Sequence, residues 1–140
     1  MRKYENSLPL KLLKAREAAM SFFRPMLQEH SITEQQWRVL RVLNDHEEME
    51  TKQLAETCCI LSPSLTGIIQ RLEQQEYVQR RKSPDDHRRT LISATEKARS
   101  LLEEMAPEVD ASYNKLTSSL SKEKMEILNE LLTDVSQIKP

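Results

Sequence analysis

The segment from Leu61 to Thr95 restricts the fold more than any other part of the chain, because its pattern changes from helix to hairpin. Ser62 is expected to cap the helix, with Pro63 at the first helical position, where a missing N–H is no loss. Apolar residues then recur at the spacing of one helical face, at Leu65, Ile68, Ile69 and Leu72. This spacing predicts a helix that packs one side against a core.

The opposite side of this helix is small, polar and nearly uncharged. At 100° per residue it gathers Pro63, Thr66, Gly67, Gln70 and Gln74, flanked by Ser64 and Arg71. Such a side suits hydrogen bonding to base edges in the DNA major groove better than plain contact with solvent.

A basic hairpin is predicted to follow. Residues 77–82 and 89–93 have strand character, and Ser83-Pro84-Asp85-Asp86 between them has turn residues. Five cations outnumber the two aspartates of the turn: Arg80, Arg81, Lys82, Arg88 and Arg89. A helix with a polar outer side next to a basic hairpin predicts a winged helix-turn-helix, with the wing on phosphates or in the minor groove.

The hairpin also carries a family signature. Asp86-His87-Arg88-Arg89-Thr90-Leu91-Ile92-Ser93-Ala94-Thr95 resembles the wing of the MarR family of bacterial transcriptional regulators, in which Asp-x-Arg precedes a short strand and a helix start. Ala94 stands in place of the usual Leu, and Lys97-Ala98 in place of Lys-Gly, so the entry to the next helix is expected to differ slightly. The resemblance covers nearly the whole chain.

Further segments resemble one branch of that family, which represses operons for homoprotocatechuate (4-hydroxyphenylacetate) degradation. They are residues 14–25, 33–38, 59–61 and 63–68. The resemblance implies a dimeric repressor that responds to an aromatic acid.

Composition favours a mainly helical chain. A single Gly among 140 residues argues against a glycine-rich phosphate loop and against a sheet with many tight turns. At this length one domain is expected, spanning residues 1–140. No Ser/His/Asp grouping or catalytic carboxylate pair is recognisable, so an enzyme is not expected, nor is a cofactor. With no membrane span, no secretory signal and two adjacent cysteines, the chain is expected to be cytoplasmic.

Other helices are predicted on both sides of the winged segment. One runs over residues 8–29, where Pro25 should bend it or end a segment, and the next begins at Thr33 with a Thr33/Gln36 capping box. Thr51 is expected to cap a helix over 52–58, after a short strand near Met49. Two more start at Thr95, with a kink at Pro107, and at Ser121. The expectation is a six-helix homodimer, mainly α with a small β-wing, in which residues 1–32 and 96–140 dimerise and 33–95 bind DNA.

The DNA-binding prediction names residues on the helix and on the wing. On the helix they are Ser62, Ser64, Thr66, Gly67, Gln70 and Arg71, and on the wing Arg81, Lys82, His87, Arg88 and Arg89. The resemblance implies that Arg88 enters the minor groove and that Asp86 fixes the wing. The alternative is a solvated Arg88 paired with Asp85 or Asp86. Gly67 costs about 1 kcal/mol in mid-helix, so either DNA or another helix should approach it closely.

A ligand site is implied by resemblance to members that sense aromatic acids. Arg16 would bind the carboxylate with its planar guanidinium, and Met20, Phe23 and Trp37 would line the aromatic part. The alternatives are an exposed Arg16 paired with an acid and ordinary core positions for the other three.

Two further functions stay open at this stage. Cys58 and Cys59 suit an oxidant-sensing regulator, although two buried, inert thiols are the expectation. The winged helix can alternatively serve as a protein-interaction module, which would bind no DNA. The three histidines show no ligand spacing, so no metal site is expected.

The sequence thus predicts a repressor that binds an inverted-repeat operator on double-stranded DNA as a homodimer. A small aromatic carboxylate is expected to release it.

Overall fold

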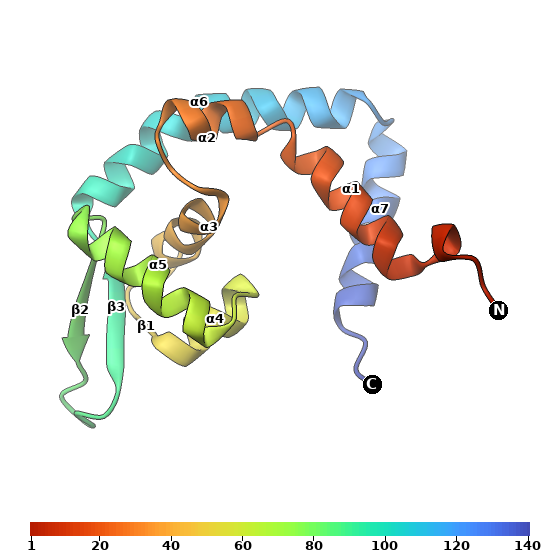
Figure 1. The fold of residues 1–140 in the computed structure, drawn as a ribbon. Helices are drawn as coiled ribbons and strands as arrows, with labels where there is room; N and C mark the ends of the chain where they lie inside the picture. Colours follow the sequence, from red (N-terminus) through yellow and green to blue (C-terminus); the bar gives the residue numbers. More distant parts are fainter. The chain divides into compact units, whose positions relative to one another are not determined.

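The computed structural model describes residues 1–140 and divides them into two compact units (Figure 1). The terminal unit comprises residues 1–25 and 108–140, and the central unit comprises residues 26–107. The predicted assignment of the outer segments to dimerisation and of 33–95 to DNA binding concerns function, and it stays a prediction. None of the helices combines the length and apolar character that a membrane crossing requires.

The central unit holds three complete helices, parts of two others and a small sheet. Its complete helices are α3 (Glu34–Asn44), α4 (Thr51–Cys58) and α5 (Ser62–Gln74). Helix α2 (Arg24–Glu29) leads into the unit, and α6 (Glu96–Ser118) leads out of it. The terminal unit contains a short 3₁₀ turn (Tyr4–Asn6), α1 (Leu8–Met20), the second part of α6 and α7 (Lys122–Ser136).

The sheet is antiparallel and has the order β1-β3-β2. Strand β1 is Met49–Glu50, β2 is Val78–Lys82 and β3 is Thr90–Ala94. Arg81 pairs with Leu91, and Leu91 pairs in turn with Glu50, so these three residues form one row across the sheet. Residues 78–94 are called the wing below. Both wing strands and the short extra strand agree with the sequence prediction to within about one residue, the usual uncertainty of element ends.

The core of the central unit is built from the predicted apolar faces. Leu65, Ile68, Ile69 and Leu72 of α5 are all buried, as predicted. They share that core with α3, α4 and one side of the sheet, through residues such as Leu40, Leu54 and Ile92. This packing fixes which side of α5 turns outward.

The first predicted helix is divided, so the structure has seven α-helices instead of six. Helix α1 ends at Met20 and α2 begins at Arg24. Pro25 has no N–H to donate to the carbonyl of Ser21, four residues earlier, and its ring clashes with a helical carbonyl there. The last turn of α1 tightens, with the Phe23 N–H donating to the Met20 carbonyl at 2.9 Å. The predicted effect of Pro25 is therefore a break.

Two of the predicted N-terminal helix caps are present in the structure and two are not. Thr33 and Gln36 form the predicted capping box, with both bonds at 3.0 Å, and Ser121 caps α7. The predictions for Ser62 and Thr51 were wrong, because each is the first residue of its helix. Leu61 and Glu50 occupy the cap positions there, and neither side chain makes a capping bond.

Candidate nucleic-acid interface

The outward side of α5 carries all the predicted contact residues of this helix. Ser62, Ser64, Thr66, Gly67, Gln70 and Arg71 are exposed. The Thr66 hydroxyl donates to the Ser62 carbonyl at 3.1 Å, which holds that side chain along the helix. Arg71 makes no ion pair. The structure thus places a row of small polar groups, with one cation near the C-terminal end, on an open surface.

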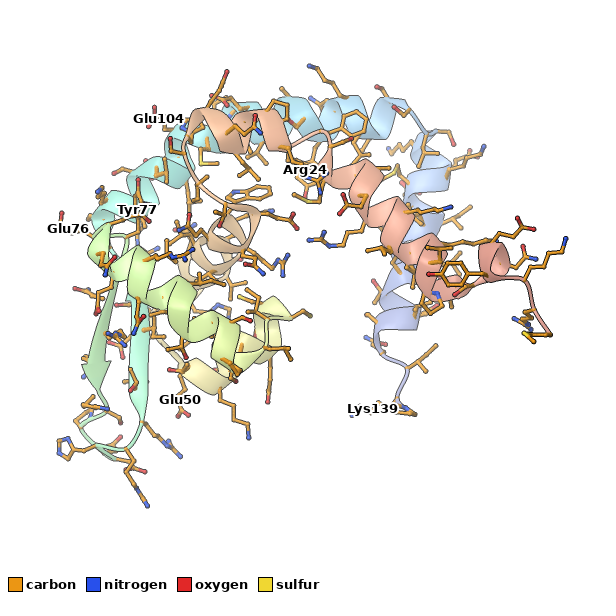
Figure 2. All side chains as sticks on the ribbon, in the orientation of Figure 1. Arg24, Glu50, Glu76, Tyr77, Glu104 and Lys139 are labelled. Carbon is orange, nitrogen blue, oxygen red and sulfur yellow. The ribbon has the colours of Figure 1, made fainter.

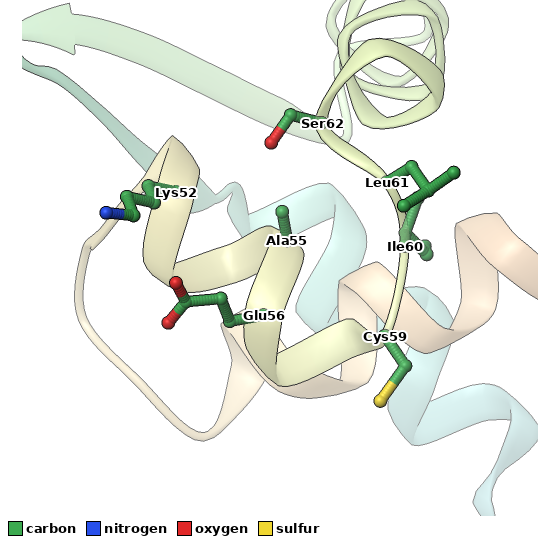
Figure 3. Close-up of a pocket in the computed structure, with 7 residues that line it drawn as sticks. All are labelled: Lys52, Ala55, Glu56, Cys59, Ile60, Leu61 and Ser62. Carbon is green, nitrogen blue, oxygen red and sulfur yellow. The ribbon is translucent and has the colours of Figure 1, made fainter. Parts of the chain in front are cut away.

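The N-terminal end of α5 lies beside a shallow recess at the turn between α4 and α5 (Figure 3). Its lining combines exposed polar groups of both helices with the apolar turn, namely Lys52, Ala55, Glu56, Cys59, Ile60, Leu61 and Ser62. No side chain caps α5, so the first-turn N–H groups of Ser62 and Ser64 keep their hydrogen-bonding capacity. Free N–H groups at a helix start attract anions such as phosphate.

Gly67 is the only glycine of the chain, and it sits in open space. A Cβ at this position would meet no atom within 4 Å. Close packing against another helix of this chain, one of the two alternatives for Gly67, is therefore absent.

The loop of the wing is organised by Asp86. Its Oδ1 accepts bonds from the Arg88 backbone N–H at 3.0 Å and from Arg88 Nε at 3.1 Å. These bonds hold the pKa of the Asp86 carboxyl below its ordinary value. The Arg88 side chain remains 92% exposed at the tip of the wing, while Asp86 holds the Arg88 backbone in place. His87, next to it, is exposed and has no partner.

One side of the sheet, named the outer face here, carries two ion pairs. Arg81 donates to Glu48 through Nε and Nη2, at 2.8 and 2.9 Å, and Arg89 Nη1 lies 3.1 Å from Glu50 Oε1. The hydrogen bond from Arg81 holds the pKa of the Glu48 carboxyl below its ordinary value. Glu50 is labelled in Figure 2.

The opposite side of the sheet continues into the core. Arg80 forms a two-bond pair with Glu73 of α5, at 3.0 and 2.7 Å. Lys82 has only a neutral partner, the Thr90 hydroxyl at 3.4 Å. Every arginine of the wing therefore has a carboxylate partner, and Lys82 is its only cation without one.

The two cysteines lie in different environments. Cys58 is buried, and burial raises the pKa of its thiol, against a weaker opposing effect of Arg38. Cys59 is exposed and adopts a left-handed backbone conformation, with φ of 54°, at the end of α4. The prediction of two buried thiols is thus correct for Cys58 and wrong for Cys59, because the left-handed residue that ends the helix points its side chain outward.

The predicted ligand residues fall in both units. Arg16, Met20 and Phe23 belong to the terminal unit, and Trp37 belongs to the central unit. The Arg16 guanidinium lies 3.7 Å from Glu17 and its side chain is 44% exposed. Phe23 is buried and meets Tyr113 edge-on, with ring centroids 4.9 Å apart. Trp37 is buried, with Arg41 stacked 4.7 Å from its ring.

Some residues that shape the interface were missed by the sequence analysis. Glu48 and Glu50 bind wing arginines, and Arg38 of α3 donates to the Cys58 carbonyl at 3.0 Å. Glu48 and Arg81 are 33 residues apart, so no local spacing rule connects them. The acidic residues on both sides of Met49 were the only signal for these pairs in the sequence.

Comparison with known proteins agrees with this geometry. The model of the MarR family matches residues 32–90. The regulator FarR of Neisseria gonorrhoeae is 42% identical over 132 residues, which cover 94% of this chain and 90% of FarR. The chain belongs to the MarR family.

Two further MarR-type proteins narrow the comparison. The homoprotocatechuate degradative operon repressor of Escherichia coli is 41% identical, over 92% of this chain and 87% of the repressor. The crystal structure of NadR in complex with 4-hydroxyphenylacetate has a TM-score of 0.84 at 40% identity, covering 99% of each chain. These relatives are transcriptional regulators and not enzymes. The predicted MarR branch and the winged-helix fold are thereby confirmed.

Proposed function

We propose that this MarR-type regulator is a cytoplasmic repressor that binds an inverted-repeat operator as a homodimer. Helix α5 would enter the major groove, with Ser62, Ser64, Thr66, Gly67, Gln70 and Arg71 toward bases and backbone. The wing would contact phosphates and the minor groove through Arg81, Lys82, His87, Arg88 and Arg89. A small aromatic carboxylate would release the complex.

The observation that carries this proposal is the open polar side of α5 around Gly67. A glycine in mid-helix is unfavourable by about 1 kcal/mol relative to alanine, and nothing in this chain packs there. Close approach of an external partner to the helix backbone accounts for its presence. Gln70, one turn later, is a residue type that pairs with adenine through two bonds, and Arg71 can reach guanine or phosphate.

Dimerisation is supported by apolar surface on the terminal unit. Neither α1 nor α7 buries a residue, although Leu13 on α1 and Leu131 on α7 are large and apolar, each 56% exposed. A second copy would cover this surface. Two recognition helices would then read half-sites about one helical turn apart.

The choice of effector is supported by the relatives. One represses a homoprotocatechuate operon, and another is solved with 4-hydroxyphenylacetate. Arg16 would bind the effector carboxylate, with Met20, Phe23 and Trp37 around the ring. The effector must bind the DNA-incompetent form more tightly than the competent one, and it shifts the equilibrium only by that difference.

Fluorescence anisotropy against DNA from the upstream region of its own gene tests the proposal, with and without 4-hydroxyphenylacetate and homoprotocatechuate. Release by either acid is the expected result, and Arg16→Ala should abolish release while leaving DNA affinity unchanged. Lys14→Ala removes a charge from the same helix and serves as the control. Binding that ignores both acids would refute the effector. Absence of salt-dependent binding to any operator fragment would favour the protein-interaction alternative.

Oxidant sensing is the second candidate, and the exposed Cys59 favours it. Ser substitution at Cys59 should leave acid-induced release unchanged if the effector is an aromatic acid. If peroxide releases the unmodified protein but not the Cys59→Ser variant, the oxidant-sensing function holds instead.

A further inference from the structure

The outer face of the wing sheet brings two acids and two arginines together. Antiparallel pairing places Arg81, Leu91 and Glu50 in one row, so their side chains share a face. Glu48 and Arg89 lie two residues from Glu50 and Leu91 along their own chain segments, which places them on that face too. The acids come from the segment around β1, and the arginines come from the wing.

The two pairs differ in geometry. The Arg81–Glu48 pair has two parallel bonds, at 2.8 and 2.9 Å, the arrangement in which arginine also binds phosphate. Arg89 lies between two acids, 3.1 Å from Glu50 and 4.0 Å from Asp86. Glu48 therefore takes the two donors that Arg81 would offer to a phosphate, and Glu50 lies next to the guanidinium of Arg89.

These contacts change the electrostatics of the wing. Its sequence alone is strongly basic, but Glu48 and Glu50 add negative charge from outside the hairpin. Proteins bind DNA of arbitrary sequence mainly by neutralising phosphates with cations, and this affinity falls as salt rises. An arginine that already holds a carboxylate gains less from a phosphate than an unpaired arginine does, because it must first give up the carboxylate.

We propose that Glu48 and Glu50 are intramolecular counter-ions that limit binding to arbitrary DNA by holding Arg81 and Arg89. This inference rests on the proposed DNA-binding function. A genome presents a large excess of non-specific sites, so weak binding to arbitrary DNA leaves more protein free for its operator.

The test compares single-charge variants of the full chain on a duplex of arbitrary sequence, with affinity measured by anisotropy over a salt series. Glu48→Gln should raise the affinity about fivefold at low salt, the upper range for breaking an exposed ion pair. The slope of the logarithm of the binding constant against the logarithm of the salt concentration should become more negative by about 0.9, because one more phosphate is neutralised. Glu50→Gln should act in the same direction.

Glu47→Gln is the matched control. It removes the same charge from the neighbouring position, but Glu47 has no arginine partner, so the salt dependence should stay unchanged. The effect of Glu48→Gln should also vanish in an Arg81→Gln background, because the arginine it frees is then absent.

Equal effects of Glu47→Gln and Glu48→Gln would overturn the inference, since only the total charge would then matter. Weaker binding by Glu48→Gln would overturn it too, because the carboxylate would then be aligning Arg81 for DNA. An operator duplex is measured in parallel with the unmodified protein. If the unmodified protein binds no DNA, the proposed function is wrong, and so is the inference that rests on it. If the unmodified protein binds the operator, the results for the variants test the inference about Glu48 and Glu50 and not the proposed function.

Discussion

At the scale of single residues, Gly67 is unfavourable for the stability of α5, and no contact within the chain requires it. It lies in the middle of α5 with no atom within 4 Å of the place where a Cβ would be. The helix would therefore accept a methyl group there without displacing any neighbour. The proposed approach of DNA to the helix backbone would give the glycine an advantage that folding does not.

Replacing Gly67 by Ala should change stability and DNA affinity in opposite directions. The free energy of unfolding should rise by about 1 kcal/mol, the difference in helix propensity. Operator affinity should fall about tenfold, because the methyl group separates α5 from the groove by an amount comparable to losing one base contact. Urea unfolding and anisotropy measure the two effects. A variant that is more stable and binds equally well would show that DNA does not approach Gly67.

Arg88 shows how one residue can satisfy two interpretations at once. It pairs with Asp86, as the solvated-turn alternative predicts, and yet its side chain is 92% exposed. The pair fixes the loop while the guanidinium stays accessible, so the ion pair does not argue against a minor-groove contact.

At the scale of elements, the end of α4 depends on a residue of another helix. The N–H groups of Cys59 and Ile60 donate to the Glu56 and Ala55 carbonyls, a common way for a helix to end around a left-handed residue. Arg38 adds a cation at the same end by donating to the Cys58 carbonyl. A cation there is favourable because the helix dipole is negative at its C-terminus. Arg38 thereby links α3 to the turn that precedes α5.

Arg38→Met should lower the free energy of unfolding by about 1 kcal/mol, as expected for a partly exposed bond to a charged donor. Arg38 also pairs with Glu34 at 3.1 Å, so Glu34→Gln is the comparison. That variant keeps the bond to the Cys58 carbonyl and should cost only about 0.3 kcal/mol. Equal losses in urea unfolding would assign the effect to the ion pair instead of the helix end.

Local patterns predicted most elements because their causes are local. The capping box at Thr33, the apolar spacing of α5 and the turn residues of the wing each act within a few positions. The caps at Ser62 and Thr51 were wrong because a residue of the right type can sit one position inside a helix. The ion pairs of Glu48 and Glu50 were not predictable, since they depend on how β1 joins the sheet. The roles of the predicted DNA and ligand residues stay predictions.

At the scale of the whole molecule, exposed carboxylates make stability depend on pH. Arginine hydrogen bonds lower the pKa of Glu48 and of Glu73, and bonds from Arg88 lower that of Asp86. In acid the unfolded chain therefore binds more protons than the folded one, so stability rises with pH. This contribution is complete above the ordinary carboxyl values and is lost as pH falls through the lowered folded values.

Urea unfolding between about pH 3 and pH 7 should accordingly show stability falling toward the acid end. Glu48→Gln removes one of the carboxyls with a lowered pKa and should make the decline shallower. An identical pH profile for the variant and the unmodified protein would mean that the Arg81–Glu48 pair does not contribute to stability in solution.

The exposed apolar side of α7 leads to a prediction about assembly. Leu131→Glu should convert the protein to a monomer in sedimentation experiments, because burying an unpaired carboxylate opposes association. Operator affinity should fall by about two orders of magnitude as the benefit of two linked half-site contacts is lost. Asn129→Glu places the same charge on the polar side of α7 and should preserve both properties. A dimeric Leu131→Glu variant would exclude this surface as the interface.

The division of the chain into units also sets an order of events during synthesis. The central unit is one continuous segment, residues 26–107, whereas the terminal unit needs residues from both sides of it. Chains leave the ribosome from the N-terminus at about 5–20 residues per second, and domains fold as units. The central unit can therefore begin folding about 2–7 seconds before residues 108–140 have been added and the terminal unit can close. The unit with the proposed DNA-binding role can thus fold before the unit with the proposed dimerisation role is complete.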